Sequence, residues 1–200
     1  MRKCMVRICS CLLIAGFFWG MGLVRDREML NRELVRLHVV ANSDGEADQA
    51  VKLEVRDAVI ESLREGLEQL TDAEAARTYI RENLPKIQRA ANRTLEVLGV
   101  DQQAVVSFCR ENFDVREYDT FTLPGGIYDS LRIIIGEGEG HNWWCVAFPS
   151  LCQPATTEEF DAKAAWAGFP EPLRETLEEK RPVRFWLLDA LGQLECRIRK

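Results

Sequence analysis

The first 24 residues differ in character from the rest of the chain. Three basic residues lie among the first seven, and Ile8–Val24 then runs for 17 residues without a charge. A basic start followed by an apolar stretch is typical of a segment that directs a protein into an export pathway. As a helix, 17 residues span about 25 Å, somewhat less than the ~30 Å hydrocarbon core of a bilayer. We predict that residues 1–24 are a signal peptide cut after Gly22 or an uncleaved signal anchor, and that residues 25–200 form a single exported globular domain.

The charge of the chain limits its partners. Of 26 basic residues, three lie in residues 1–24, which hold no acidic residue, so the exported part keeps 23 basic against 32 acidic residues and a net charge of −9. Such a domain is poorly suited to neutralising nucleic-acid phosphates. The basic start places the short N-terminus in the cytoplasm and the remainder outside. We therefore expect no nucleic-acid partner, and a transient membrane contact through residues 1–24.

Apolar spacing after the export segment changes between the period of a strand and the period of a helix. Ser43 with Glu46 predicts a capping box at a helix start, Pro85 suits the first turn of a further helix, and Gly99 suits the position after a helix end. The expected fold is α+β, a sheet with about three helices packed on one side. The predicted strands cover 34–40, 104–110, 131–135 and 143–148. The predicted helices cover 46–70, 73–84 and 85–98. Residues 183–188 and 194–199 are predicted to form a closing hairpin around Leu191-Gly192.

Leu123–Cys152 is the segment richest in turn residues and aromatic residues. Its glycines at 136, 138 and 140 alternate with glutamates, which repel phosphate, and no Lys-Ser/Thr pair follows, so a phosphate cradle is not expected. The segment is instead a flexible hairpin loop or a loop that contacts a partner. Trp143 and Trp144 would point to opposite faces of a strand. Either one of them is exposed as an aromatic anchor for a partner, or both are buried under neighbouring elements.

The histidines and cysteines leave several alternatives open. His38 lies in a predicted strand and is expected to be structural, and no set of residues has the spacing of a metal site, so no metal or cofactor is expected. Four cysteines follow the export segment, which permits disulfides in an oxidising compartment. A Cys145–Cys152 bridge and free thiols are both compatible with the spacing, and the state of Cys109 and Cys196 is open. An exported hydrolase would pair Cys145 or Cys109 with His141 or His38.

Two stretches resemble a known family. Leu34–Ile60, which includes Ala-Asn-Ser-Asp-Gly, and Leu123–Cys152, which includes Gly-Glu-Gly-Glu-Gly-His-Asn-Trp-Trp, resemble the stage II sporulation protein R family of endospore-forming bacteria. Gly126 and Ser130 stand where alanines are usual, and Ser150 stands where a second proline is usual. These small changes do not disturb the resemblance.

The resemblance implies a signalling function and no enzymatic activity. Family members are made in the forespore, exported into the space between forespore and mother cell, and activate a membrane-embedded aspartic protease that cleaves the precursor of sigma factor E. A membrane-tethered structural module and the Cys/His hydrolase are the alternatives. The family's shared residues, which are candidates for contacts with the protease, fall here on Asn42, Ser43, Asp44, Leu123, Pro124, Gly136, Gly138, Asn142, Trp143 and Trp144.

Overall fold

A four-stranded mixed sheet organises the structure. The computed structural model describes residues 2–70, 72–149, 162, 164–165, 168–178 and 183–198. The strand order is β2-β5-β1-β6, with β1 parallel to β5 and the other pairs antiparallel. The elements are α1 (Arg2–Glu33), β1 (Val35–Val40), α2 (Glu46–Glu68), α3 (Ala73–Val97), β2 (Ala104–Phe113), β3 (Arg116–Glu117), β4 (Thr122–Leu123), β5 (Gly126–Ile135), β6 (Asn142–Phe148), α5 (Glu171–Glu178) and α6 (Val183–Ile198).

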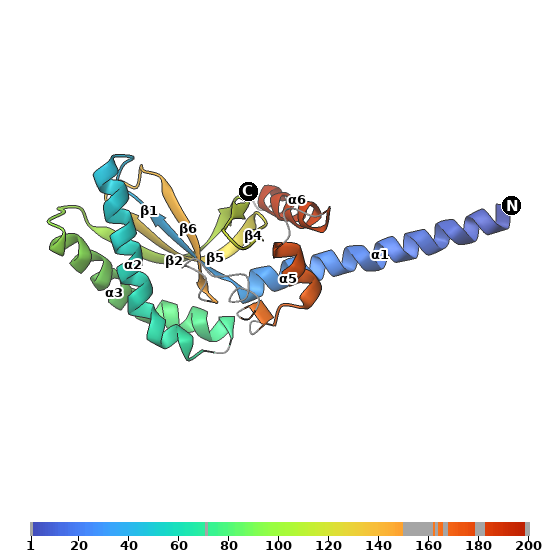
Figure 1. Ribbon diagram of the computed structural model, residues 1–200, viewed down its shortest axis with the longest axis horizontal. Coiled ribbons are helices and arrows are strands. Elements are labelled where there is room, and N and C mark those ends of the chain that lie inside the picture. Colours follow the sequence, from blue (N-terminus) through green and yellow to red (C-terminus); the bar gives the residue numbers. More distant parts are fainter. Residues whose placement is uncertain are drawn as a thin grey trace.

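The helices and the small ribbon lie in two groups around the sheet. Helices α2 and α3 lie along one face, whereas the β3–β4 ribbon, α5, α6 and the second half of α1 gather at one end of the molecule (Figure 1). The expected α+β class is confirmed, and all four predicted strands exist, with β2 and β5 longer than predicted. The helices on the first face are two rather than three, because α3 spans two of the predicted segments.

Strand β1 is buried on both sides. Val35, Leu37 and Val39 pack into the core beneath the helices, as their alternation predicts. The intervening Arg36 and His38 do not face water: they are 0% and 5% exposed. Alternation along a strand indicates two different faces, and here the second face is a buried polar and aromatic layer rather than solvent.

Helix α3 corrects the prediction that Pro85 begins a new helix. Pro85 lies inside a continuous helix, on its exposed side. The proline removes one backbone donor, but on the exposed side the freed carbonyl can be solvated, and the same buried stripe continues through both halves of the helix. That stripe consists of Ala73, Ala76, Ile80, Ile87, Ala91 and Leu95.

The helix ends follow the predictions in part. The Ser43–Glu46 capping box is wrong, because α2 begins after Gly45 with no side-chain cap. Gly99 is confirmed as the residue that ends α3: its φ is +70°, and the amides of Gly99 and Val100 donate to the carbonyls of Glu96 and Leu95. This pair of bonds is the Schellman arrangement, which a residue without Cβ adopts most readily.

Helix α6 replaces the predicted C-terminal hairpin. Its buried residues, Phe185, Leu188, Asp189 and Gly192, recur at helical spacing. Gly192 is therefore not a turn residue. A Cβ at this position would lie 1.9 Å from the carbonyl oxygen of Gly125, so the glycine permits close approach of α6 to the loop before β5.

Helix α1 has two parts with different surroundings. Its large apolar side chains from Leu13 to Met21 are exposed, and Figure 1 shows this part projecting from the body. From Leu23 onward the helix packs: Leu23, Asp26, Arg27 and Leu30 are buried. Within the part of the chain that the structure describes, no helix combines the length and apolar character needed to cross a membrane. Cleavage after Gly22 stays a prediction.

Candidate functional site

Two loops meet at one edge of the sheet. Strands β1 and β5 are parallel, so their carboxyl ends lie at the same edge, and the segments that follow them become neighbours. These segments are residues 41–45 and 136–141, which we call the tip. Eight of the ten candidate contact residues lie in the tip or directly after it, at the start of β6. The exceptions are Leu123 and Pro124.

Asn42 joins the two loops of the tip. Its side-chain oxygen accepts a hydrogen bond from the amide of Glu137 at 3.1 Å, and its backbone oxygen accepts one from the amide of Glu139 at 3.1 Å. Its side-chain nitrogen donates to Asp48 on α2 at 2.8 Å. One side chain thus fixes the loop after β1, the loop after β5 and the first turn of α2 relative to one another.

Ser43 and Asp48 complete this connection. The Ser43 hydroxyl donates to Asp48 Oδ2 at 2.6 Å and accepts from the amide of Gly45 at 3.2 Å. The hydrogen bonds from Ser43 and Asn42 lower the pKa of the Asp48 carboxyl. Ser43 therefore positions α2 through a carboxylate rather than through the predicted capping box.

Glycine is required where the loops touch. Gly136 has a φ of +57°, and a Cβ there would lie 2.2 Å from Asn42 Oδ1. At Gly140 a Cβ would lie 2.2 Å from the backbone oxygen of Ser43. The alternating glycines thus allow two segments to pack at backbone distance. Because β5 and β6 each pair with β1 and not with each other, the segment between them is not the predicted hairpin loop.

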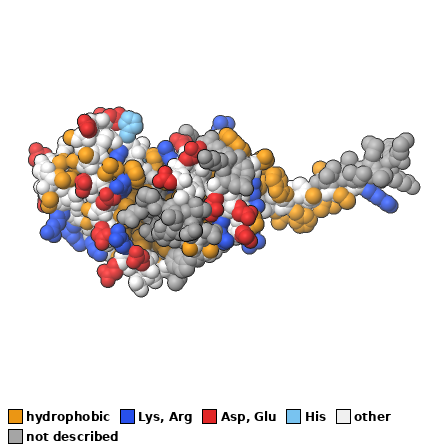
Figure 2. Space-filling view, viewed as in Figure 1, with side chains coloured by type: hydrophobic (Ala, Val, Ile, Leu, Met, Phe, Trp, Pro, Cys, Tyr) orange, Lys and Arg blue, Asp and Glu red, His pale blue; other side chains and the backbone are white. Residues whose placement is uncertain are grey.

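The outer surface of the tip is polar. Asp44 accepts from the amide of His141 at 2.6 Å and also contacts its ring nitrogen Nδ1. Beneath them the ammonium of Lys52 donates to the carbonyl of His141 at 2.9 Å, and burial, followed by the charge of Arg56, lowers the pKa of this lysine. Asp44, Glu137, Glu139 and His141 are exposed, and Figure 2 shows acidic side chains at this tip.

His38 lies below the tip on the second face of the sheet. Its Nδ1 is 3.1 Å from Glu111 Oε2, its Nε2 is 2.9 Å from Asn142 Oδ1, and its ring stacks on Trp144 with centroids 3.7 Å apart. Burial alone would raise the pKa of Glu111, but the hydrogen bond from His38 and the positive charges of His38 and Arg132 outweigh it and lower that pKa. These contacts give the predicted structural histidine its partners.

This pair yields a pH-dependent prediction. Because the folded-state pKa of Glu111 lies below its ordinary value near 4.5, the contribution of the carboxylate is complete above that pH and is lost as the pH falls through the folded pKa. Glu111→Gln should reduce the free energy of unfolding by about 1.5 kcal/mol at pH 7 and by much less at pH 3. Urea unfolding at both pH values measures this, with the exposed Glu65→Gln as control. An equal loss at both pH values would contradict the assignment.

The two tryptophans lie on opposite faces, as predicted. Trp143 packs against the core beneath the helices, with the guanidinium of Arg56 4.3 Å from its ring centroid. Trp144 packs on the other face against His38 and Phe113. Both side chains are half-buried, so each keeps part of its surface available.

Leu123 and Pro124 lie at the other end of the molecule and are buried. They open a loop that contacts α1 and α6: Tyr128 donates to the carbonyl of Pro124 at 2.8 Å and accepts from Arg27 at 2.9 Å. Asp189 of α6 accepts from the amide of Gly125 at 2.9 Å. The Leu-Pro-Gly-Gly sequence thus connects the sheet to the two terminal helices.

In the ranges that the structure describes, Cys109 and Cys145 do not form the arrangement that a thiol hydrolase requires. Cys145 is disulfide-bonded, and Cys152, its expected partner, lies outside the described residues, so that pairing stays a prediction. Cys109 is a free thiol whose pKa is raised by burial and by Glu111. A raised pKa disfavours the thiolate, and the ring nitrogens of His38 face Glu111 and Asn142 rather than a thiol.

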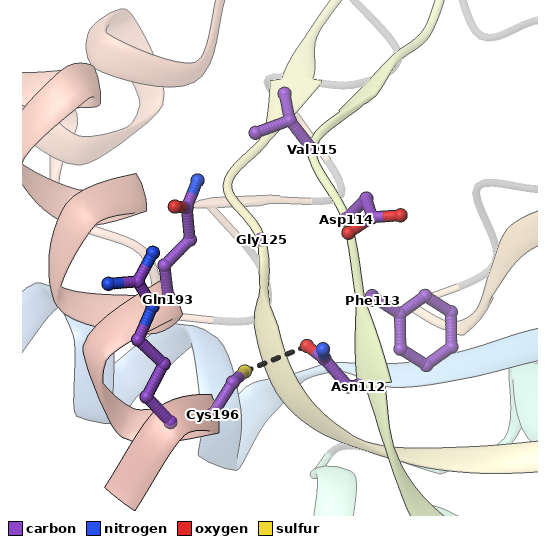
Figure 3. Close-up of a pocket in the computed structure, with 8 residues that line it drawn as sticks. Asn112, Phe113, Asp114, Val115, Gly125, Gln193 and Cys196 are labelled. Carbon is purple, nitrogen blue, oxygen red and sulfur yellow. Dashed lines mark hydrogen bonds between the residues drawn. The ribbon is translucent and has the colours of Figure 1, made fainter.

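Cys196 lies beside a cavity of about 450 Å³ between α6 and the end of β2. Figure 3 shows Cys196 on the helix facing Asn112 on the strand. The thiol donates to Asn112 Oδ1 at 2.7 Å, and burial raises its pKa. This geometry makes Cys196 a hydrogen-bond donor that joins α6 to β2.

Three residues of these networks, Asp48, Lys52 and Glu111, have no clear signal in the sequence, and neither does the buried Arg36 of β1. Asp48 and Lys52 resemble ordinary polar residues of an amphipathic helix. Arg36 and Glu111 resemble the solvent-facing residues of alternating strands. Only the topology brings their partners to them. Among the described residues, no three His, Cys, Asp or Glu side chains are grouped as a metal site would require.

Comparison with known sequences gives the chain its family. Residues 31–158 match the family described as stage II sporulation protein R (spore_II_R). The chain belongs to this family. It is 39% identical over 120 residues to the Stage II sporulation protein R of Bacillus subtilis (strain 168), an alignment that covers 60% of this chain and 54% of the relative. The chain thus spans about half the length of that curated relative.

The predicted resemblance is therefore confirmed, and family membership supports a role in sporulation. The matched region contains the whole sheet, the tip and helices α2 and α3. It excludes α5, α6 and most of α1. No solved structure matches the chain.

Proposed function

We propose that this chain is an exported signal that activates a membrane-embedded aspartic protease during spore formation. It would be made in the forespore, pass into the space between forespore and mother cell, and act there without catalysing a reaction itself. The activated protease would then cleave the precursor of sigma factor E. Family membership and the basic, apolar N-terminal segment support this proposal.

The tip is the observation that carries the proposal. A ligand that selects one state of its receptor must bind that state more tightly than the other, and a rigid surface loses little entropy on binding. Hydrogen bonds of Asn42 and Ser43 connect the two loops of the tip and Gly136 and Gly140 allow their close contact, so we expect the tip to be rigid. Exposed carboxylates and His141 form its outer surface. The tip lies at the end of the molecule away from α1 (Figure 1), so it remains accessible when α1 contacts a membrane.

Reconstitution tests the function directly. The full chain, the candidate receptor protease in membranes and the sigma factor precursor would be combined, and precursor cleavage would be followed together with co-purification of the chain and the protease. We expect cleavage only when the chain is present, and binding that survives purification. Cleavage that is independent of the chain, or no binding, would reject the proposal.

A charge reversal tests the tip. Glu137→Lys combined with Glu139→Lys changes two exposed side chains of the tip, and should reduce the cleavage rate at least tenfold because the receptor then meets the opposite charge. The matched control reverses two exposed carboxylates on α2, Glu61→Lys with Glu65→Lys, and should leave cleavage unchanged. Thermal unfolding confirms that both variants fold. Normal cleavage with the tip variant would place the contact elsewhere.

A further inference from the structure

An apolar groove lies between α1 and α6. It encloses about 810 Å³ and is lined almost entirely by apolar side chains and glycines. On the α1 side Phe17, Met21 and Val24 are 66%, 53% and 49% exposed. On the α6 side Leu187, Leu191 and Leu194 line it. The described residues thus leave an apolar channel open at the end of the molecule opposite the tip.

Helix α6 extends this surface with a stripe of its own. Val183, Trp186, Leu194 and Ile198 are 71%, 55%, 53% and 75% exposed. Their spacing places them on one side of the helix, opposite its buried residues Phe185, Leu188, Asp189 and Gly192. A helix with one side in the protein core and an apolar opposite side has a second surface to cover.

The exposed charges around this surface are mostly positive. Its carboxylates are mostly engaged: Asp26 pairs with Arg184, Glu195 lies 3.8 Å from Arg27, and Asp189 is buried. Arg25 and Arg197 are exposed, with Glu28 as the exposed carboxylate of the groove. The sequence adds Arg199 and Lys200 directly after α6. An otherwise acidic protein therefore presents arginines beside its apolar end.

We infer that the groove and the exposed stripe of α6 lie on an anionic phospholipid surface, with α6 in the plane of the interface. Apolar side chains with a tryptophan, bordered by arginines, are the composition of helices that bind at the boundary between headgroups and acyl chains. The stripe is also continuous with the charge-free part of α1, so both helices would contact the same lipid layer. A two-fold contact between copies would instead place the same arginines against each other.

Vesicle flotation of the full chain tests the inference. Vesicles of phosphatidylglycerol with phosphatidylethanolamine should bind the chain more tightly than vesicles of phosphatidylcholine. Trp186→Glu combined with Leu194→Glu should weaken binding to the anionic vesicles at least tenfold. The control, Val97→Glu with Val105→Glu, changes side chains that are 79% and 59% exposed on other elements and should leave binding unchanged. Circular dichroism verifies that α6 remains helical.

A second measurement separates α6 from α1. Brominated acyl chains quench nearby tryptophans, so the wild-type chain should lose more fluorescence than Trp186→Phe, and the difference reports Trp186 alone. Binding that is unchanged in the double glutamate variant, with no quenching of Trp186, would mean that α1 alone holds the lipid and would overturn the inference. A dimer in sedimentation that the double variant dissociates, without quenching of Trp186, would show an interface between copies and would also overturn it.

Discussion

Gly140→Ala is expected to lower the free energy of unfolding by about 3 kcal/mol, because the added Cβ would overlap backbone atoms of Ser43 and force the two loops of the tip apart. The added Cβ would lie 2.2 Å from the backbone oxygen of Ser43 and 2.5 Å from its carbonyl carbon. No rotamer change relieves a clash with backbone atoms. The loops must separate, which also breaks the 3.0 Å hydrogen bond from the Gly140 amide to Ala41.

Urea unfolding measures the loss, and Gly20→Ala is the matched control. Nothing lies within 4 Å of a Cβ at Gly20, and alanine favours a helix over glycine, so this variant should be no less stable than the wild type. Because the tip is also the proposed receptor surface, Gly140→Ala should reduce precursor cleavage even where most of the protein is folded. A stability equal to that of the wild type would show that the loops are not packed as described.

The sequence predicts the strands well because their apolar residues alternate or cluster over short runs. Val35–Val40 and Leu131–Ile135 are examples, and each lies within a strand of the structure. The prediction of a strand at Val183–Leu188 is wrong, because this segment of α6 is apolar on both sides: one side packs on the sheet and the other is exposed. Short apolar runs do not distinguish a strand from a helix, and Gly192 resembled a turn.

The candidate site is predicted as a list of residues but not as an arrangement. Nothing in the sequence states that β1 and β5 are parallel neighbours, and this pairing alone brings residues 41–45 against residues 136–141. Asn42 and Gly136 are therefore better explained as partners of each other than as two separate contacts. The exposed residues Asp44, Glu137 and Glu139 are then the candidates for contact with the receptor that we propose.

Arg36→Ala is expected to have the largest effect on stability, a loss of about 4 kcal/mol. Arg36 is fully buried at the centre of the sheet. Its Nε donates to the carbonyl of Cys145 at 3.0 Å, and one Nη donates to the hydroxyl of Tyr118 at 2.8 Å. Its guanidinium carbon lies 4.3 Å from the ring centroid of Phe113 and 5.2 Å from that of Tyr128. Truncation leaves a cavity and removes both donors.

Arg36→Met separates packing from charge. Methionine fills much of the same volume among the aromatic rings and leaves no buried cation to desolvate, although Cys145 and Tyr118 still lose their donor. Within the described residues no carboxylate pairs with Arg36, so the substitution leaves no buried carboxylate without its partner. We expect a loss of about 1–2 kcal/mol for this variant. Arg110→Ala, at a side chain that is 50% exposed, should cost less than about 1 kcal/mol and serves as the control.

Thermal and urea unfolding of the three variants decides what Arg36 contributes. If methionine restores most of the stability that alanine loses, Arg36 acts mainly as a space-filling side chain whose stem and planar head pack between aromatic rings. If methionine is as damaging as alanine, the cation and its two hydrogen bonds hold β1, β6 and the loop at Tyr118 together. Since β1 carries both Arg36 and His38 and leads directly into the tip, the second result would connect the buried charge of the sheet to the geometry of the surface that we propose for the receptor.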